Sequence, residues 1–243
     1  MPRTVILAGG FGTRIRHLLL DLPKPMAPVA GLPFCEWVLR WGLHHGLTDF
    51  TLSTGHLADV VESHFAPQPI PGATISWARE TTPLGTAGGF LNCVAGSSPP
   101  ADGRWLVANG DSLVLADPRP LLALLDREDT VAAVLGLRVP DTARYGSLDV
   151  SPEGRLLAFR EKVPGAGIIN AGIYAFRSEA LSLMQAKRPL SFEIDVFPSL
   201  IALGKVRALS VEAPFIDIGT PETLPAATAF IQAHPQHFTL PSP

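Results

Sequence analysis

The sequence LAGGFGTR spans Leu7–Arg14, follows an apolar run that begins at Val5, and precedes the tripeptide PKP at Pro23–Pro25. Glycine lets a main chain approach phosphate groups closely and adopt positive φ. The exposed amide groups of such a loop form an anion-binding nest, and Arg14 and Lys24 add the positive charge that a triphosphate needs. The stretch therefore predicts a first strand that ends in a polyphosphate-binding loop.

This loop differs from the two commonest phosphate-binding motifs. A P-loop ends in Gly-Lys-Ser/Thr, whereas this one ends in Gly12-Thr13-Arg14. A dinucleotide-binding fingerprint needs a third glycine, and Ile15 stands at that place. Because short glycine motifs also occur in ordinary turns, the assignment depends on the rest of the chain.

The composition excludes several classes of protein. The chain has 243 residues, 47% of them hydrophobic and 17% charged, which fits one large domain or two small ones. No apolar run reaches the ~18–20 residues that a membrane-spanning helix needs, and residues 1–8 lack the charged region and cleavage site of a signal peptide. The net charge of −3 argues against a surface that binds nucleic acid.

The cysteines indicate a reducing compartment. Cys35 and Cys93 are the only two and have no CxxC spacing, so free thiols are expected rather than a disulfide. We therefore expect a cytoplasmic protein that acts on small molecules and has no nucleic-acid or membrane partner. The sequence is compatible with a homo-oligomer but does not determine the oligomeric state.

Alternating strand and helix patterns predict the fold class. Strands are expected at Thr4–Ala8, Phe50–Thr54, Thr74–Ala78, Trp105–Ala108, Val131–Leu137, Ile168–Phe176 and Val206–Val211. Helices are expected around Phe34–Trp41 and at Leu57–Phe65, Thr86–Val94, Pro118–Asp126, Ser191–Leu203 and Pro221–Ala233. This alternation predicts an α/β fold with a largely parallel sheet, and ligands bind such folds at the carboxyl ends of the strands.

Three further features concern the organisation of the chain. The aromatic stripe within Phe34–Trp41 recurs at helix spacing and is interpreted as core. Residues 138–165 interrupt the rhythm with short strands and turn signals, which predicts a β insertion over the sheet. We expect residues 1–234 to form a single domain and the Pro-rich tail, residues 235–243, to be frayed.

Two aspartates follow apolar, strand-like segments. Asp111 closes the segment Trp105–Asp111, and Asp217 lies between apolar neighbours in Phe215–Thr220. An unpaired carboxylate is unfavourable among apolar residues, and two carboxylates that face a triphosphate provide hard oxygen ligands for Mg²⁺. The sequence therefore predicts a Mg²⁺ site held by Asp111 and Asp217.

Together these groups indicate transfer of a nucleotidyl group to a phosphorylated acceptor. A phosphate oxygen of the acceptor would attack the α-phosphorus of a nucleoside triphosphate, and pyrophosphate would leave in line. Because the second pKa of a phosphomonoester is about 6, the acceptor is largely dianionic at pH 7 and needs no strong general base. We assign Arg14 and Lys24 to the triphosphate, and Lys162, which follows Glu161 after a short strand, to the acceptor phosphate.

The chain resembles the sugar-1-phosphate nucleotidylyltransferases. The resemblance runs in order over about residues 3–230, and its segments are Leu7–Arg14 with Pro23–Pro25, Pro83–Gly88, Asn109–Asp111, Glu161–Lys162, Asn170–Tyr174 and Asp217–Pro221. It implies a Rossmann-like nucleotidyltransferase fold, with a mixed, mostly parallel sheet flanked by helices, and a dependence on Mg²⁺.

The resemblance also implies the binding residues. Those implied for the nucleotide are Ala8, Gly9, Gly10, Gly12, Thr13, Glu80, Gly85, Thr86 and Asn109. Those implied for the sugar phosphate are Gly146, Glu161, Lys162 and Asn170. Arg144 would either reach the acceptor phosphate or brace its own loop.

Within this family, residues 22–28, 144–146, 167–174, 191–193 and 215–222 resemble the D-glycero-α-D-manno-heptose 1-phosphate guanylyltransferases. Base choice also has a physical argument at Glu80, five residues before Gly85. A carboxylate only accepts hydrogen bonds, which matches the adjacent N1–H and N2 amine of guanine, whereas uracil offers a single N–H. Uridylyl relatives also carry Glu here, so guanine is favoured but uracil stays open.

Other functions use the same features differently. A mannose-1-phosphate guanylyltransferase or an N-acetylmuramate-1-phosphate uridylyltransferase would keep the mechanism and change the specificity. A non-catalytic subunit that senses nucleotide sugars would have lost charges at the phosphate and metal positions, which this chain retains. A nucleotide-sugar glycosyltransferase usually shows Asp-x-Asp, and Asp111-Ser112-Leu113 lacks the second aspartate.

Overall fold

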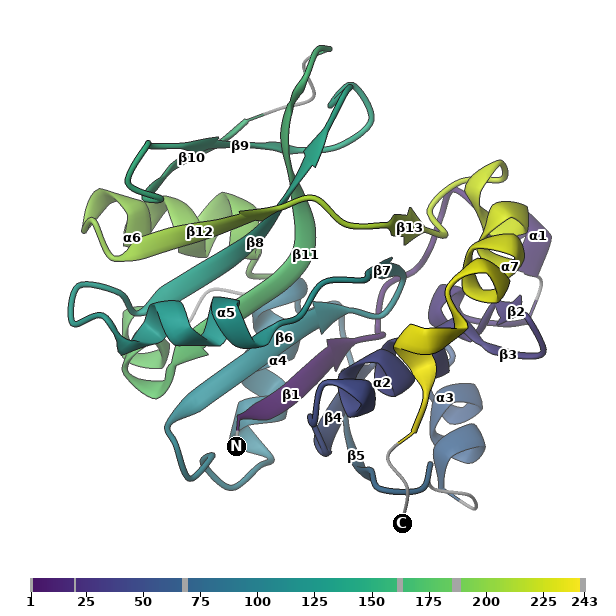
Figure 1. The fold of residues 1–243 in the computed structure, drawn as a ribbon. Coiled ribbons are helices and arrows are strands. Elements are labelled where there is room, and N and C mark those ends of the chain that lie inside the picture. Colours follow the sequence, from purple (N-terminus) through teal and green to yellow (C-terminus); the bar gives the residue numbers. More distant parts are fainter. Residues whose placement is uncertain (1, 20, 67–69, 161–163, 185–188, 241–243) are drawn as a thin grey trace.

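A computed structural model describes the chain except residues 1, 20, 67–69, 161–163, 185–188 and 241–243 (Figure 1). Its strands are β1 (Arg3–Leu7), β2 (Pro28–Val29), β3 (Leu32–Pro33), β4 (Asp49–Thr54), β5 (Thr74–Arg79), β6 (Arg104–Asn109), β7 (Ser112–Val114), β8 (Ala132–Val139), β9 (Ser147–Val150), β10 (Leu156–Arg160), β11 (Gly167–Arg177), β12 (Val206–Val211) and β13 (Phe215–Asp217). Its α-helices are α1 (Arg16–Leu19), α2 (Phe34–His44), α3 (Ala58–Phe65), α4 (Thr86–Ala95), α5 (Arg119–Ala123), α6 (Phe197–Ala202) and α7 (Thr223–Ala233). Short 3₁₀ or π turns are η1 (Lys24–Met26), η2 (Leu124–Asp126), η3 (Ser178–Leu183), η4 (Phe192–Val196) and η5 (Pro235–Phe238).

One mixed sheet of nine strands forms the centre of the molecule (Figure 1). Its main order is β12-β8-β11-β6-β1-β4-β5, and β9 and β10 branch from β11. The pairs β1–β4, β1–β6, β4–β5 and β8–β12 are parallel, and every pair that includes β11 is antiparallel. Only β11 and β10 therefore run against the other strands, which confirms the mixed, mostly parallel α/β fold.

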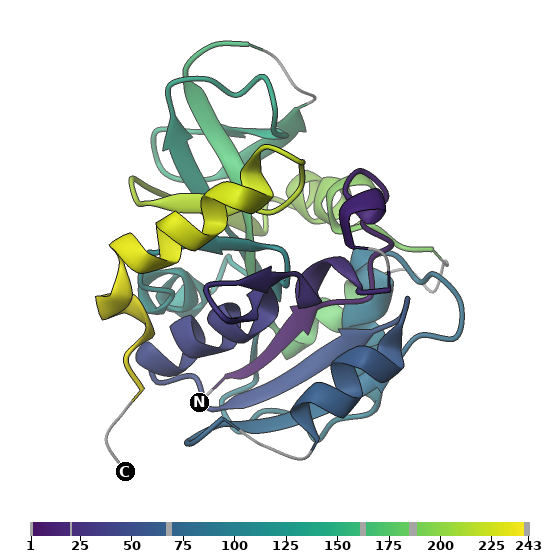
Figure 2. The same cartoon turned by 90° about the vertical axis from the view of Figure 1, so that its right-hand side faces the viewer.

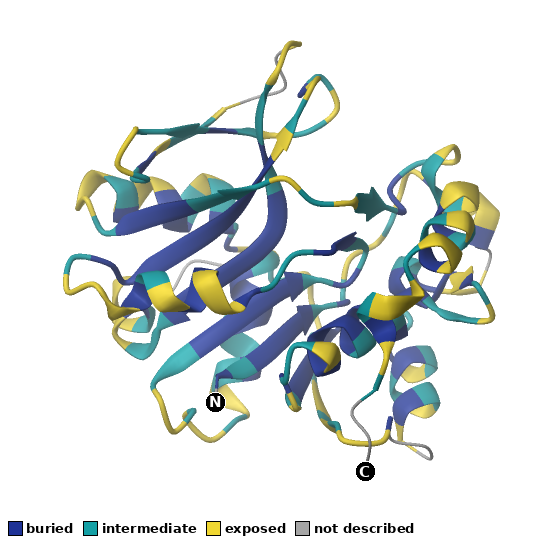
Figure 3. Cartoon of the chain, in the orientation of Figure 1, coloured by how far each residue is buried: buried dark blue, intermediate teal, exposed yellow. Residues whose placement is uncertain are grey.

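The central strands β1, β4, β6 and β8 are buried on both faces, as helices on two sides of a sheet require, whereas the edge strand β5 is half-buried or exposed throughout. In β1, Val5 packs into one apolar cluster and Ile6 into the other. Side chains of α2, α3, α5 and α7 belong to the cluster on the Ile6 face, and those of α4 and α6 to the cluster on the Val5 face. Figure 2 shows these helices around the sheet, and in Figure 3 the central strands β1, β4, β6, β8 and β11 are dark blue, hence buried, along most of their length.

The predicted elements agree closely with the structure. All seven predicted strands are present, with ends shifted by at most two residues, and the aromatic stripe of α2 is core, with Phe34 and Trp41 almost fully buried. The segment Ser191–Leu203 differs, because it is the π turn η4 followed by α6. Pro198 lacks the N–H that would continue a regular helix from η4 into α6.

The β insertion is present, but it does not lie over the sheet. Strands β9 and β10 form an antiparallel pair, and Ser147 of β9 pairs with Ile169 of β11. Strand β11 has 11 residues and its neighbour β6 has only six, so the first part of β11 extends beyond β6. Its unpaired backbone groups there need partners, and β9 supplies them, so the insertion continues the sheet.

The C-terminal segment is packed at its beginning, contrary to the expectation of a frayed tail from Pro235. Residues Pro235–Phe238 form η5, and Phe238 is buried with its ring 5.1 Å from that of Trp37. Burial of the apolar ring of Phe238 stabilises this packed arrangement relative to a tail that is free in water. Cys35 and Cys93 are buried and free, as expected. Within the described ranges, no helix has the length and apolar character needed to cross a membrane.

Candidate active site

The carboxyl ends of four parallel strands meet at one edge of the sheet. Leu7, the last residue of β1, pairs with Ser53 of β4 on one side and with Asn109 of β6 on the other. Strand β5 ends beside β4, at Arg79, and Glu80 follows it. The glycine-rich loop, Glu80 and Asp111 therefore leave the sheet at the same edge, where ligands bind such folds.

The glycine-rich loop folds closely against its neighbours. Ala8 is fully buried, and its amide donates to the Ser53 carbonyl at 2.9 Å, so Ala8 supports the loop and does not line the cavity. Gly12 has a φ of +55°, and a Cβ there would lie 2.7 Å from the Cβ of Lys24. Both the conformation and the close approach require glycine at position 12. Phe11 remains 48% exposed, with its ring 5.2 Å from that of His56.

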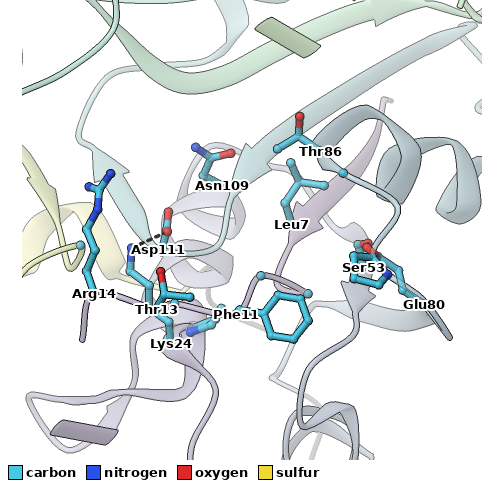
Figure 4. Close-up of a pocket in the computed structure, with 17 residues that line it drawn as sticks. Leu7, Phe11, Thr13, Arg14, Lys24, Ser53, Glu80, Thr86, Asn109 and Asp111 are labelled. Carbon is cyan, nitrogen blue, oxygen red and sulfur yellow. Dashed lines mark hydrogen bonds and ion pairs between the residues drawn. The ribbon is translucent and has the colours of Figure 1, made fainter. Parts of the chain in front are cut away.

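A cavity of about 490 Å³ lies above this loop (Figure 4). Its walls come from the glycine loop, the ends of β4, β5 and β6, and the start of α4. The predicted residues that line it are Gly9, Gly10, Gly12, Thr13, Arg14, Lys24, Glu80, Gly85, Thr86, Asn109 and Asp111. It is thus large enough for a nucleotide, and all the predicted nucleotide residues except Ala8 face it.

Glu80 is held in a fixed orientation at one end of this cavity (Figure 4). Ser53 Oγ donates to Glu80 Oε1 at 2.8 Å, and the Leu84 amide donates to Glu80 Oε2 at 3.0 Å. A Cβ at Gly89 would lie 2.6 Å from Glu80 Oε1, so α4 can approach the carboxylate only with glycine there. Each carboxylate oxygen keeps a lone pair for a ligand.

Lys24 and Asp111 form an ion pair at the other end of the cavity. Lys24 begins η1, and its Nζ lies 2.6 Å from Asp111 Oδ2. Asp111 follows β6 through Gly110, where a Cβ would lie 2.8 Å from the Leu7 carbonyl oxygen. The close packing of Gly110 on β1 therefore fixes where the Asp111 carboxylate leaves the sheet.

Asp217 lies beside Asp111 because β13 pairs with β7. Asp217 is opposite Ser112, and the Ile218 amide donates to the Asp111 carbonyl at 3.0 Å. The Asp217 carboxylate accepts hydrogen bonds from the Gly219 amide at 2.8 Å and from the Tyr145 hydroxyl at 2.7 Å. Burial and the contact with Asp217 raise the pKa of Tyr145 to about 12, so the phenol stays a donor at neutral pH.

A second cavity, of about 510 Å³, opens on the other side of this pair of aspartates. Asn170, Tyr145 and Arg144 line it, and the Arg144 guanidinium lies 3.9 Å from Asp217 Oδ2. Gly146 does not line the cavity, but its carbonyl oxygen accepts a hydrogen bond from the backbone N–H of Asn170 at 3.0 Å. Glu161 and Lys162, predicted to bind the sugar phosphate, lie outside the described residues.

The two cavities share five residues: Arg14, Lys24, Asn109, Asp111 and Gly219. Arg14 is exposed and makes no ion pair with any other described residue. Ligands in the two cavities would therefore meet beside one free guanidinium, one ammonium and one carboxylate. Such a junction can align two phosphorylated groups and neutralise their charge.

Asp111 at the junction and Asp217, which lines the second cavity beside it, offer the hard oxygen ligands that fit a Mg²⁺ ion. A Cβ at Gly219 would lie 2.6 Å from Asp217 Oδ1 and 3.4 Å from Lys24 Nζ, so the Lys24 ammonium is a cation placed close to both aspartates. Among the described side chains, no three of His, Cys, Asp or Glu gather as a metal site. Two carboxylates suffice for Mg²⁺, which takes its remaining ligands from substrate phosphates and water.

The sequence profile of the family described as Nucleotidyl transferase matches residues 3–234. The chain belongs to this family. A mannose-1-phosphate guanylyltransferase of Mycobacterium tuberculosis is 39% identical over 225 residues, which cover 90% of this chain and 61% of that protein. A D-glycero-alpha-D-manno-heptose 1-phosphate guanylyltransferase of Aneurinibacillus thermoaerophilus is 30% identical over 222 residues, which cover 90% of this chain and 93% of that protein.

A solved structure is similar over almost its full length. HddC from Yersinia pseudotuberculosis, in a crystal structure with GMP-PN, has a TM-score of 0.81 and 30% identity, and the match covers 94% of this chain and 99% of that one. This nucleotidyl transferase therefore spans nearly the whole of HddC, whereas it covers less than two thirds of the mycobacterial protein.

Sequence reasoning missed three residues of this nucleotidyl transferase site. Ser53, Phe11 and Tyr145 received no predicted role, although each contacts or lines a cavity. Ser53 stands among other polar residues near the end of β4, which gives it no distinct local signal, whereas Phe11 could have been noticed as a large apolar residue between two glycines. The contact of Tyr145 with Asp217 has no local signal, because 72 positions separate the two residues.

Proposed function

We propose that this nucleotidyl transferase catalyses transfer of a guanylyl group from GTP to a sugar 1-phosphate, with D-glycero-α-D-manno-heptose 1-phosphate as the acceptor. The observation that carries the proposal is the junction of the two cavities at Arg14, Lys24 and Asp111. GTP would occupy the cavity above the glycine loop, and the sugar phosphate the cavity lined by Asn170. Residues 1–234 would act as one domain, in agreement with the range of the family match.

The reaction needs alignment and charge neutralisation more than acid or base catalysis. An oxygen of the acceptor phosphate attacks the α-phosphorus of GTP, the bond from that phosphorus to the bridging oxygen breaks, and pyrophosphate leaves with the electron pair. Arg14 and the loop amides bind the triphosphate, and Lys24 lies beside the attacked phosphate. Lys162 and Glu161 are proposed to bind the acceptor, together with Asn170.

Asp111 and Asp217 would hold Mg²⁺ at the junction. When bound, Mg²⁺ supplies positive charge that neutralises the phosphate oxygens and orients the two reacting groups. Contacts within the chain already hold both carboxylates. Tyr145 and the Gly219 amide donate hydrogen bonds to the Asp217 carboxylate, and Lys24 pairs with that of Asp111.

The choice of guanine is supported by Glu80. The Ser53 hydroxyl and the Leu84 amide hold its carboxylate, so its free lone pairs have a defined direction. Guanine presents two adjacent N–H donors, which match a fixed carboxylate, whereas uracil presents one. The names of the mycobacterial and heptose relatives, and the GMP-PN complex of HddC, support the same base.

Mannose 1-phosphate is a second candidate acceptor. The mycobacterial mannose-1-phosphate guanylyltransferase is more similar in sequence, at 39% identity, than the heptose enzymes at 30%. The heptose enzyme and HddC match this chain over nearly their full lengths, and for that reason the heptose phosphate is preferred.

Pyrophosphate release with Mg²⁺ tests the proposal. GTP, ATP, UTP, CTP and dTTP are each combined with the heptose phosphate and with α-mannose 1-phosphate, and the Asp111→Asn variant serves as the control for contaminating activity. We expect the largest kcat/KM with GTP and the heptose phosphate. A preference for mannose 1-phosphate selects the second candidate, and the absence of release with every pair contradicts the proposal.

A further inference from the structure

Strand β11 contains an irregularity at the edge of the acceptor cavity, which is the second cavity, lined by Asn170 and Tyr145. Asn170 pairs with Gly136 of β8, and Tyr174 pairs with Val134, so four steps along β11 match two steps along β8. In a regular strand, residues four apart are separated by about 13 Å. Here the bulge brings the side chains together, and Asn170 Nδ2 donates to the Tyr174 hydroxyl oxygen at 2.8 Å. Bulges of this kind redirect side chains beside active sites.

Tyr174 connects Asn170 to a carboxylate from a distant part of the chain. The Tyr174 side chain is fully buried among the rings of Phe192 and Phe197. Its hydroxyl donates to Glu193 Oε1 at 2.8 Å, and Ser191 Oγ donates to Glu193 Oε2 at 2.9 Å. Burial raises the pKa of Tyr174, so its phenol keeps its proton.

These contacts determine which way the Asn170 amide points. A carboxylate only accepts, so the single proton of Tyr174 is directed to Glu193, and the phenol oxygen can only accept from Asn170. The amide nitrogen of Asn170 must therefore face Tyr174, and Oδ1 accepts from the Gly172 amide at 3.0 Å. The opposite orientation of the amide would place its oxygen against the phenol oxygen, with no proton between them.

What remains of Asn170 is a defined pair of groups. One N–H and one lone pair of Oδ1 are left after the contacts with Tyr174 and Gly172. Asn170 lines the acceptor cavity, so these groups are available to a ligand there. A vicinal diol is the matching ligand, because one hydroxyl can accept from Nδ2 while its neighbour donates to Oδ1.

We propose that Tyr174 and Glu193 are positioning residues that fix the amide orientation of Asn170, and that this orientation selects acceptors with a vicinal diol. The proposal rests on the proposed function for the chemistry of the acceptor. Neither Tyr174 nor Glu193 lines either of the two cavities, so both act through Asn170.

The segment that carries Glu193 also contacts α4 on the nucleotide side, through its backbone and through the Phe192 ring, which lies 5.8 Å from that of Phe90. The Leu190 carbonyl accepts from the amides of Ala87 and Gly88, and the Phe192 amide donates to Thr86 Oγ1 at 2.9 Å. Replacement of the Tyr174 hydroxyl leaves these contacts in place. The effect should therefore be confined to the acceptor, which separates a positioning role from general loss of structure.

Steady-state kinetics of Tyr174→Phe, Asn170→Ala and the double variant test this inference. Phenylalanine preserves the buried ring and removes only the hydroxyl. We expect the KM for the sugar 1-phosphate to rise about tenfold in Tyr174→Phe, the loss associated with one buried hydrogen bond, while the KM for GTP stays within about twofold. If Tyr174 acts through Asn170, the double variant is no worse than Asn170→Ala alone.

Two further variants test the positioning role independently of Tyr174→Phe. Glu193→Gln offers both a donor and an acceptor to Tyr174, so it should raise the acceptor KM to a smaller extent and weaken discrimination against deoxy-sugar phosphates that lack one hydroxyl of the diol. Ser178→Ala is the matched control. It removes the hydrogen-bond partner of the Trp105 indole, and Trp105 belongs to the same apolar cluster as Tyr174. Ser178 follows the last residue of β11, whereas Asn170 lies in the first part of that strand. This control variant should leave the acceptor KM unchanged.

The outcomes separate this inference from the proposed function. An unchanged acceptor KM in Tyr174→Phe, in an assay where the wild-type protein is active, overturns the positioning role alone. Additive losses in the double variant do the same, because they show that Tyr174 acts independently of Asn170. A wild-type protein without activity on any sugar 1-phosphate overturns the proposed function, and with it the assignment of the diol.

Discussion

The ammonium of Lys24 lies 2.6 Å from Asp111 Oδ2, although 87 positions separate the two residues in the chain. Neither side chain is deeply buried, with exposed fractions of 15% for Lys24 and 35% for Asp111. An ion pair of this exposure contributes little to the free energy of folding. Its importance is local, because it places a cation and a carboxylate at the junction of the two cavities.

Asp111→Asn should therefore abolish most of the activity and leave the fold intact. The substitution keeps the size of the side chain but removes the negative charge that would hold Mg²⁺. We expect kcat to fall by about 100-fold or more and the Mg²⁺ concentration for half-maximal rate to rise. Asp126→Asn is the control, since Asp126 pairs with Arg104 at an exposed site outside both cavities. Near-normal Mg²⁺-dependent turnover in Asp111→Asn would contradict the metal assignment.

Glu80→Gln should weaken the preference for guanine. Glutamine presents one acceptor and one donor where Glu80 presents two acceptors, so one contact with guanine is lost. The ratio of kcat/KM for GTP to that for UTP should fall about tenfold. Glu153→Gln, at an exposed turn, is the matched control. If the ratio is the same in both variants, Glu80 does not read the base.

The sequence predicted the fold well because apolar periodicity marks buried elements. The alternation of Val5 and Ile6 between two faces of β1, and the aromatic stripe of α2, are local patterns. They can be recognised in the sequence without knowing which elements pack against them. The position of β9 and β10 could not be predicted in this way. It depends on the extra length of β11 relative to β6, which is a property of two strands that lie far apart in sequence.

The site was predictable where a motif carries its own chemistry. Gly12, Arg14 and Asp111 are read from short segments, and the structure brings them to one cavity. Ser53 and Tyr145 act through contacts with Glu80 and Asp217, which only the sheet pairing and the folded insertion create. No pattern within a few residues encodes such contacts, so they require the structure.

Gly219→Ala should impair catalysis through steric displacement of Asp217. A Cβ at position 219 would lie 2.6 Å from Asp217 Oδ1, so the carboxylate must move. Because a misplacement of about 1 Å can reduce rates about 100-fold, we expect a loss of that order in kcat with a small change in thermal stability. Gly96→Ala is a suitable control, since a Cβ there meets only ordinary contacts at 3.8 Å and beyond. Normal activity in Gly219→Ala would show that the orientation of Asp217 is not critical.

His45 should make folding stability depend on pH below neutrality. Burial lowers its pKa from 6.5 to about 4, and the positive charges of Arg119 and of the neighbouring histidines His44 and His237 act in the same direction, while Asp117, 3.8 Å away, opposes the shift. Its Nε2 is buried without a hydrogen-bond partner among the described residues. The neutral form is thus the one that the folded state accommodates.

The sign of the effect follows from linkage. Above about pH 6.5 the imidazole is neutral in both the folded and the unfolded chain, so its contribution to stability is fully present. Between about 6.5 and 4 the unfolded chain binds a proton that the folded chain does not, so the free energy of unfolding falls as the pH falls. We expect a loss on the order of 1 kcal/mol between pH 7.5 and 5, after allowance for solvent near the ring.

Urea unfolding of the wild-type protein and of His45→Gln at these two pH values measures this contribution. Glutamine does not titrate, so the variant should lose less stability than the wild type on acidification, and the difference between the two isolates His45 from the other histidines. Equal losses in both proteins would show that His45 is accessible to protons in the folded state and that other groups carry the pH dependence.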